Sequence, residues 1–292
     1  MILPITVLIA AKNEAANLPK CLAALTGRVG RVIVIDSQST DGSTELAQAA
    51  GAEVVQFHYA GGYPKKRQWA LDTLPINTDW VFLLDADEVV PAALWDELAT
   101  AIARPEAPDA FFITKGIHFF GRRFRFGGFS FAAVLLLRRG KGRFEELVVD
   151  SRNKLDMEVR ERVVVVGSIG RLTTPLIHDD FKGLEAYIDR HNQYSTWEAR
   201  LRYQFLQTGS YGSSTVSAKL FGDTQEQRRW LKKLAIRLPG ESFAWFVYHY
   251  LIWFGFLEGR AGWIACRLRS DYIAAVRAKI LELERNDVHT RK

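Results

Sequence analysis

The chain has 292 residues, 48% of them hydrophobic and 25% charged, an ordinary globular balance that allows a sizeable core. Its 39 Lys and Arg against 33 Asp and Glu give a net charge of +6, which favours an anionic partner such as a nucleotide, a phospholipid or a nucleic acid. Cys21 and Cys266 match no metal or redox spacing, so we expect free thiols in a reducing compartment. Residues 1–14 lack a basic leader, so we expect the protein on the cytoplasmic side.

Strand and helix patterns alternate along the first third of the chain. Short apolar, β-branched runs predict buried strands at 5–10, 32–35, 52–57 and 80–84. Leucines at helical spacing, or helix start and stop residues, predict helices within 11–25, 39–51, 64–74 and 91–103. This alternation predicts an α/β fold with a mostly parallel sheet and helices on both faces. Further strands are expected at 111–114, 131–137 and 163–166.

Polar side chains stand at the ends of three of these strands: Lys12-Asn13-Glu14, Asp36 and Asp85-Ala86-Asp87-Glu88. Ligands of such sheets bind beyond the carboxyl ends of the strands. Asp85 and Asp87 would point to one side if the extended geometry continues. Two carboxylates there repel each other unless a cation separates them, and Mg²⁺ or Mn²⁺ bound to a nucleotide diphosphate meets this need. The alternative is that these carboxylates cap the helix that follows.

Three segments in order resemble a known family. They are I-x-V-L-I-A-A-K-N-E, V-I-V-I-D-S-x-S-T-D-G-S and W-V-F-L-L-D-A-D-E. Their order is similar to that of family-2 glycosyltransferases with the GT-A fold. Later stretches, HFFGRRFRFGG, VRERVVVVGSIGRL and LIHDDFKGLEAYIDRHNQYS, resemble the bacterial enzymes that add glucose or related sugars to the lipopolysaccharide core and other cell-envelope glycans. The resemblance covers about the first 190 residues and implies a catalytic GT-A domain over 1–190. Strand patterns are absent from Tyr187 on, which predicts a helical, membrane-associated C-terminal region over 191–292.

The resemblance also implies roles in holding a nucleotide-sugar donor. Asn13 and Glu14 would hold the nucleoside, Asp36 would accept from the uracil or ribose, and Asp85 would face the nucleoside. Arg67 resembles the basic residue that the family aims at the diphosphate. Simpler roles stay open for these side chains, because Glu14 could be a helix-start charge and Asp36 a plain turn residue. Lys65 and Lys66 could replace Arg67, or all three could form a solvated basic helix face.

Two further roles follow from the resemblance. Asp87 would be the main ligand of a divalent cation, Mg²⁺ or Mn²⁺, and His178 a third ligand, although a lone histidine is more often structural. The family often carries a His-Glu pair where this chain has Arg160-Glu161. Glu161 would be the general base of an inverting displacement, but Arg160 and Arg162 could lower its basicity. The competing residues are Glu158, Asp156 and Asp150, and Glu161 could instead be an exposed charge before a strand.

Basic and aromatic residues dominate two later segments. Residues 121–131, GRRFRFGGFSF, could form an acceptor-facing loop that recognises phosphate or sugar, or a packed edge with snorkelling arginines. Residues 243–257 contain eight Phe, Trp or Tyr and no formal charge, yet fall short of the ~20 residues that span a bilayer. Next to the basic stretch 227–237 they indicate an in-plane anchor on anionic lipid. The alternative is a helix pair packed on the catalytic domain or on another subunit.

Together these features predict a metal-dependent, inverting hexosyltransferase with a nucleotide-sugar donor, UDP-linked by family resemblance. We expect a lipid-linked or glycan acceptor of the cell envelope and a peripheral position on the cytoplasmic face of the inner membrane. Two other functions compete with this one. A nucleotidyltransferase would prefer a glycine-rich loop after the first strand, which AAKNEAAN does not supply. A basic membrane-binding or nucleic-acid-binding module is the other, but the sequence has no recognised nucleic-acid motif.

Overall fold

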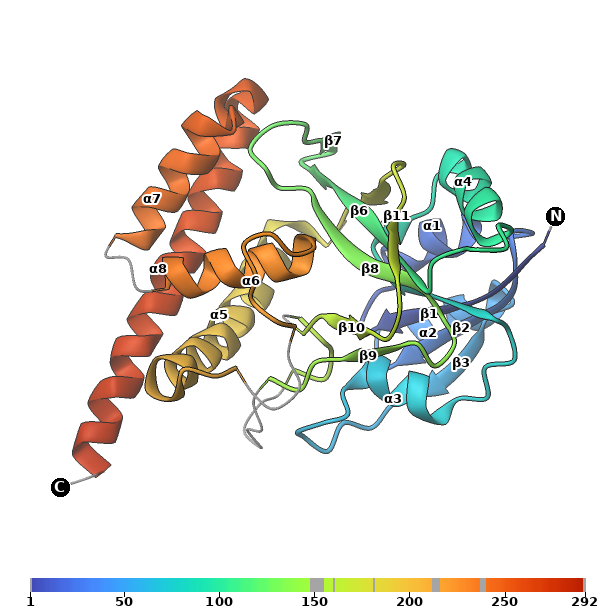
Figure 1. Cartoon of the computed structure of the whole chain (residues 1–292), viewed down its shortest axis with the longest axis horizontal. Helices are drawn as coiled ribbons and strands as arrows, with labels where there is room; N and C mark the ends of the chain where they lie inside the picture. Colours follow the sequence, from blue (N-terminus) through green and yellow to red (C-terminus); the bar gives the residue numbers. More distant parts are fainter. Residues whose placement is uncertain are drawn as a thin grey trace.

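The computed structural model describes residues 2–147, 155–159, 161–180, 182–211, 216–236 and 240–290 (Figure 1). A mixed sheet flanked by helices makes up the first part of the chain, and the helices of the C-terminal part stand together at one side of it. The long last helix runs along the outer edge of the molecule (Figure 1). The predicted α/β class is confirmed.

Four parallel strands form the first half of the sheet, in the order β3-β2-β1-β4. These strands are β1 (Leu3–Ala11), β2 (Val29–Asp36), β3 (Glu53–Gln56) and β4 (Trp80–Asp85). The helices between and after them are α1 (Leu18–Ala23), α2 (Ser43–Ala49), α3 (Lys66–Thr73) and α4 (Ala92–Ile102). Every strand and helix predicted from the first third of the sequence is present, because each pattern is a local one.

The second half of the sheet reverses direction. Strand β8 (Phe131–Arg138) runs antiparallel to both β4 and β6 (Ala110–Phe119), and β6 pairs in parallel with β12 (Leu176–His178). The short strand β5 (Glu88–Val89) ends the order β4-β8-β6-β12-β5. Smaller strands are β7 (Arg122–Arg123) and β11 (Ile169–Arg171) beside β6, and the pair β9 (Gly142–Phe144) and β10 (Val163–Val165). This order brings residue 88 back beside residue 178.

Apolar side chains fill both faces of the sheet. Alternate residues of β1 enter different cores, with Val7 and Ile9 on the face covered by α1 and α4, and Leu8 on the face covered by α3. All three are fully buried. A strand buried on both faces needs a continuous apolar run, which explains why ITVLIA contains a single polar residue. The two cores hold the carboxyl ends of the strands in fixed positions.

The C-terminal region is entirely helical within the described residues. It contains α5 (Gly183–Thr208), α6 (Thr224–Ala235), α7 (Glu241–Val247), a π-helical turn (Tyr248–Ile252), a 3₁₀ turn (Gly255–Glu258) and α8 (Gly259–Thr290). Helix α5 runs through residue 190 without interruption, and it packs on α8 through a core that includes Ala199, Ile273 and Val276. No helix among the described residues is both long and apolar enough to cross a bilayer.

Candidate active site

Strand pairing places two of the predicted site residues at one rim of the sheet. Ala11, the last residue of β1, pairs with Asp36 of β2, and Ala10 pairs with Asp85 of β4. Asp36 and Asp85 therefore flank the end of β1, and the loop that carries Asn13 and Glu14 leaves from between them. The rim is the carboxyl edge at which ligands of α/β sheets bind.

The chain turns directly after β4, so the extended geometry that would have aligned Asp85 with Asp87 does not continue. Glu88 Oε2 accepts a hydrogen bond of 2.9 Å from the backbone N–H of Asp85 and closes the turn. Glu88 then enters β5 and pairs with His178 of β12, while the Asp87 carbonyl accepts from the N–H of Asp179 at 3.0 Å. The expectation that Asp85 and Asp87 share one strand face is therefore wrong, because the backbone reverses between them.

The turn gathers carboxylates around His178. Asp85, Glu88 and His178 each offer a ligand atom, and these atoms lie within 4.8 Å of one another. His178 Nδ1 is 3.5 Å from Asp87 Oδ1 and 3.4 Å from Glu88 Oε1. Both Asp87 Oδ1 and His178 Nδ1 are buried and lack a hydrogen-bond partner within the part of the chain that the structure describes. A carboxylate oxygen and an imidazole nitrogen that are buried without a hydrogen-bond partner fit a Mg²⁺ or Mn²⁺ ion.

Two of the protein's own cations also reach these carboxylates. Lys115 Nζ, from β6, lies 2.7 Å from Asp85 Oδ2 and 2.6 Å from Glu88 Oε1. The Arg67 guanidinium forms an ion pair with Asp85 Oδ1 and donates to the Glu158 carbonyl at 3.1 Å. Arg67 thus lies beside the carboxylate cluster, where a diphosphate could meet it. Neither Lys115 nor Glu88 had a role in the sequence-based site, and no local pattern marks Lys115.

The charges of this cluster shift two pKa values. Burial alone would raise the pKa of Glu88, but the charges of Lys115 and His178 outweigh it and lower the pKa. Burial alone would lower the pKa of His178, but Asp87 and Glu88 outweigh it and raise the pKa. Both shifts have the same physical origin, the attraction between these carboxylates and the cationic side chains beside them.

The predicted nucleoside-binding residues tie the loops after β1 and β2 together. The Asp36 carboxylate accepts hydrogen bonds from Ser39, from Thr44 at 2.8 Å and from Gln56 at 2.9 Å. These bonds outweigh burial, which by itself would raise the pKa of Asp36, and the pKa is lowered. Asn13, with a φ of 53°, accepts from the N–H of Thr40 through its side chain at 2.9 Å. These hydrogen bonds therefore fix the loops after β1 and β2 relative to each other.

Glu14 connects this rim to the start of α5. Its carboxylate pairs with Lys182 and accepts from Asn17 Nδ2 at 2.8 Å, and Asn17 also donates to Asp180 at 3.2 Å. Burial raises the pKa of Glu14, although Lys182 and Asn17 act in the opposite direction. The interpretation of Glu14 as a helix-start charge is incomplete, because its side chain bridges segments that are more than 160 residues apart.

Comparison with known proteins agrees with this geometry. Residues 6–150 match the model of the family described as glycosyl transferase family 2. Over 204 residues the chain is 30% identical to the lipopolysaccharide core biosynthesis glycosyltransferase LpsC of Rhizobium meliloti (strain 1021). The aligned residues make up 68% of this chain and 71% of LpsC. The chain belongs to glycosyltransferase family 2.

Two other comparisons are consistent with this membership. A glycosyltransferase of Rickettsia felis is 36% identical over 94 residues, 32% of each chain. The crystal structure of the mannosyltransferase PcManGT from Pyrobaculum calidifontis, in complex with GDP-Man and Mn²⁺, superposes with a TM-score of 0.50 at 15% identity, covering 96% of this chain and 88% of that one. The second likeness shows the shared GT-A fold of this glycosyltransferase.

The residue predicted to be the general base of the glycosyltransferase is deeply buried. The Glu161 side chain has no exposed surface, and its Oε1 lies 2.5 Å from Lys65 Nζ and accepts from Tyr63 at 2.8 Å. Lys65 also stacks over the Trp197 ring at 4.5 Å. The alternative of an exposed charge before a strand is therefore wrong, whereas the role of Glu161 as general base stays a prediction. Arg160 and Asp150 lie outside the described residues.

The other residues of this basic segment are equally enclosed. Lys66 is buried, donates to the Ala11 carbonyl at 2.7 Å and pairs with Asp156 at 3.2 Å. Burial lowers the pKa of Lys66, and it raises that of Glu158, whose carboxylate accepts from two N–H groups at the start of α3. A solvated basic helix face is thus ruled out. These ion pairs fix α3 so that Arg67 reaches Asp85.

Proposed function

We propose that this family-2 glycosyltransferase transfers a hexose, with inversion, from a UDP-linked donor to a lipid-linked or oligosaccharide acceptor of the cell envelope, in the biosynthesis of the lipopolysaccharide core. One observation supports the proposed donor site: carboxylates and His178 gather at the carboxyl edge of the sheet, with Arg67 beside them. The name of LpsC supports the acceptor class. Family resemblance supports UDP.

The cluster fits a resident divalent cation. Asp85, Asp87, Glu88 and His178 would supply its ligands, and the ion would offset the negative charge that develops on the departing diphosphate. Mn²⁺ in the PcManGT complex is consistent with this assignment. The site is partly neutralised by Lys115 and Arg67 already, so binding of the ion requires these two side chains to give up contacts with Asp85.

The protein's own residues act on the donor in three ways. The loops that carry Asn13 and Asp36 hold the nucleoside, and the hydrogen bonds that tie these loops together limit the entropy lost on binding. Arg67, released from Asp85, offers a planar guanidinium to the diphosphate oxygens. Lys182 holds Glu14 against the start of α5 and thereby closes one side of the rim.

The acceptor side of the reaction involves the C-terminal region. Nine large apolar side chains between residues 243 and 263 are 43–72% exposed, although α7 packs against α8. These residues are Phe243, Tyr248, Leu251, Ile252, Trp253, Phe254, Phe256, Leu257 and Trp263. Exposed aromatic residues of this density, next to the exposed Arg260 and Arg267, fit the interface of an anionic bilayer. We propose that this aromatic surface docks the enzyme on the cytoplasmic face of the inner membrane.

A thermal-shift assay with UDP-glucose, UDP-galactose and GDP-mannose, each with and without Mn²⁺, tests the donor site. A ligand at 100 times its Kd stabilises the folded state by about 2.7 kcal/mol, and for a chain of 292 residues that corresponds to a shift of about 4–5 °C. We expect a UDP-sugar to give such a shift with Mn²⁺, and Asp87→Asn to abolish the Mn²⁺-dependent part. Absence of a shift with every nucleotide sugar would contradict the proposal.

A further inference from the structure

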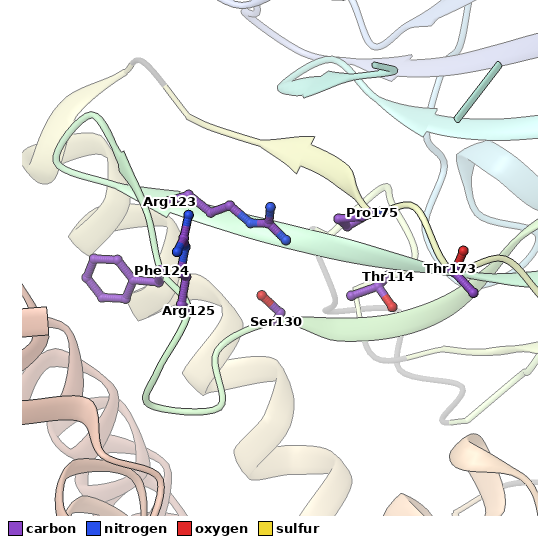
Figure 2. A pocket seen from close by; sticks show the side chains of 7 residues that line it. All are labelled: Thr114, Arg123, Phe124, Arg125, Ser130, Thr173 and Pro175. Atoms are coloured by element: carbon purple, nitrogen blue, oxygen red, sulfur yellow. The ribbon is translucent and has the colours of Figure 1, made fainter. Parts of the chain in front are cut away.

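A hollow of about 370 Å³ lies on the sheet away from the carboxylate cluster. Figure 2 shows its walls, which come from β6, from β7 and the loop that joins it to β8, and from the segment before β12. The lining residues are Thr114, Arg123, Phe124, Arg125, Ser130, Thr173 and Pro175. We call it the arginine pocket, because both of its charged residues are arginines.

Within β6, the side chains of Thr114 and Lys115 lie on opposite faces of the strand. Thr114 lines the pocket, whereas the next residue, Lys115, contacts Asp85 and Glu88. Successive side chains of a strand point to opposite faces. Gly116 lies on the pocket side, where a Cβ would come within 2.8 Å of the Leu176 carbonyl and 3.8 Å of Arg123 Nε. None of the residues that line the pocket belongs to the cluster of Asp85, Glu88 and His178.

Arg123 and Arg125 are exposed and have no acidic partner among the described residues. Their neighbour Arg122 differs, because it forms an ion pair with the buried Glu258. The hydroxyls of Thr114 and Ser130 likewise have no hydrogen-bond partner in the described part of the chain, whereas that of Thr173 donates to Glu97 at 2.9 Å. Two guanidiniums and two hydroxyls are thus available to one ligand.

The backbone that carries the arginines is fixed. The N–H groups of Arg125 and Phe126 donate to Glu258 Oε1 at 2.6 and 2.9 Å, and that of Gly127 donates to the Trp253 carbonyl at 2.7 Å. Phe124 is buried between two other aromatic rings, at centroid distances of 5.9 and 5.4 Å. Because Trp253 belongs to the aromatic surface, the same contacts place the pocket beside the proposed membrane face.

We propose that the arginine pocket binds a phosphate group. Guanidinium forks match phosphate oxygens with two parallel hydrogen bonds, and hydroxyls can donate to the remaining oxygens. A phosphate at this position can belong to a phosphorylated sugar of the acceptor or to a lipid headgroup. Only the naming of the acceptor rests on the proposed function, because the binding of phosphate to the pocket needs neither donor nor cation.

Calorimetric titration of the full chain with inorganic phosphate and with glucose 6-phosphate, at low salt and without nucleotide, tests the pocket. The test variant is R123Q/R125Q, and the matched control is R28Q/R143Q, which removes the same charge from exposed arginines elsewhere. We expect at least tenfold weaker binding in R123Q/R125Q and no change in the control. Equal binding in both double variants, or none in the wild type, would overturn the proposal.

Two further measurements complete the experiment. Vesicles of phosphatidylcholine with and without phosphatidic acid identify the source: arginine-dependent partitioning onto phosphatidic acid indicates a lipid headgroup, and arginine-dependent binding of glucose 6-phosphate alone indicates a phosphorylated sugar. The UDP-sugar thermal shift of R123Q/R125Q should equal that of the wild type. If R123Q/R125Q shows a normal UDP-sugar shift and binds phosphate as the wild type does, only the arginine pocket is refuted. If the wild type shows no UDP-sugar shift but binds phosphate through the arginines, only the donor site is refuted.

Discussion

Lys115 contacts two of the carboxylates that would hold a divalent cation, and its replacement gives the sharpest test of the site. The ammonium group contacts Asp85 at 2.7 Å and Glu88 at 2.6 Å, and the side chain is nearly buried. A cation that binds there must displace the ammonium or tolerate its repulsion. Lys115→Met keeps the length and apolar stem of the side chain but removes the charge. We therefore expect Lys115→Met to bind Mn²⁺ more tightly than the wild type.

The size of the effect follows from the two contacts. Each hydrogen bond to a charged group contributes about 1.5–3 kcal/mol, so Mn²⁺ must displace interactions worth about 3–6 kcal/mol. The lower value corresponds to an affinity about 100-fold higher in the variant. Without metal, we expect Lys115→Met to be less stable than the wild type, because Glu88 would be buried without its partner Lys115. Removal of one partner of a buried ion pair costs about 3–5 kcal/mol of folding stability.

Mn²⁺ titration by calorimetry, with thermal unfolding in EDTA and in Mn²⁺, measures both effects without any turnover assay. We expect Lys115→Met to melt earlier in EDTA and to gain more from Mn²⁺ than the wild type. Lys115→Arg, which keeps the charge, and Lys141→Met, beyond the far end of β8, serve as controls. An Mn²⁺ affinity that is the same in Lys115→Met and in the wild type would refute the competition between Lys115 and the metal.

Two other predictions address the rim and the membrane face. Asp36→Asn should destabilise the fold by about 1–3 kcal/mol in urea at neutral pH, since it breaks a fully bonded carboxylate. The pKa of Asp36 is lowered on folding, so its carboxylate contributes its full stabilisation above the unfolded pKa of about 3.9 and loses it as the pH falls through the folded pKa. A difference in unfolding free energy between the wild type and Asp36→Asn that already disappears between pH 7 and pH 5 would contradict this. I252S/W253S should weaken the free energy of partitioning onto phosphatidylglycerol vesicles by about 2–3 kcal/mol, measured by flotation. Leu281→Ser, which is also exposed but lies on the last turns of α8, should leave it unchanged. Equal flotation of the two variants would exclude docking through the aromatic surface.

Local patterns accounted for most of the first half of the fold. The apolar runs that became β1 to β4, and the helix signals between them, depend on side chains only a few residues apart, so they can be read without tertiary structure. The rule that parallel strands end at one edge then placed Asp36 and Asp85 together correctly.

The burial of three charged side chains could not be predicted from the sequence. Lys65, Lys66 and Glu161 sit in segments as polar as any solvated surface, yet all three are buried. Each is buried because a partner arrives from far along the chain, Glu161 for Lys65 and Asp156 for Lys66. An ionised side chain tolerates burial only when such a partner is present, and a single sequence does not state which distant segments meet.

The sequence alone determined that acidic residues end parallel strands at one rim, because strand periodicity and strand direction are properties of short segments. Only the tertiary structure decided which groups complete the site. Glu88 meets His178 through the pairing of β5 with β12, and Lys115 arrives on β6, a strand that joins the sheet through β8 and β12. These meetings depend on the register of strands 27 to 90 residues apart in the chain, and register is fixed by the packing of the whole sheet on its two cores.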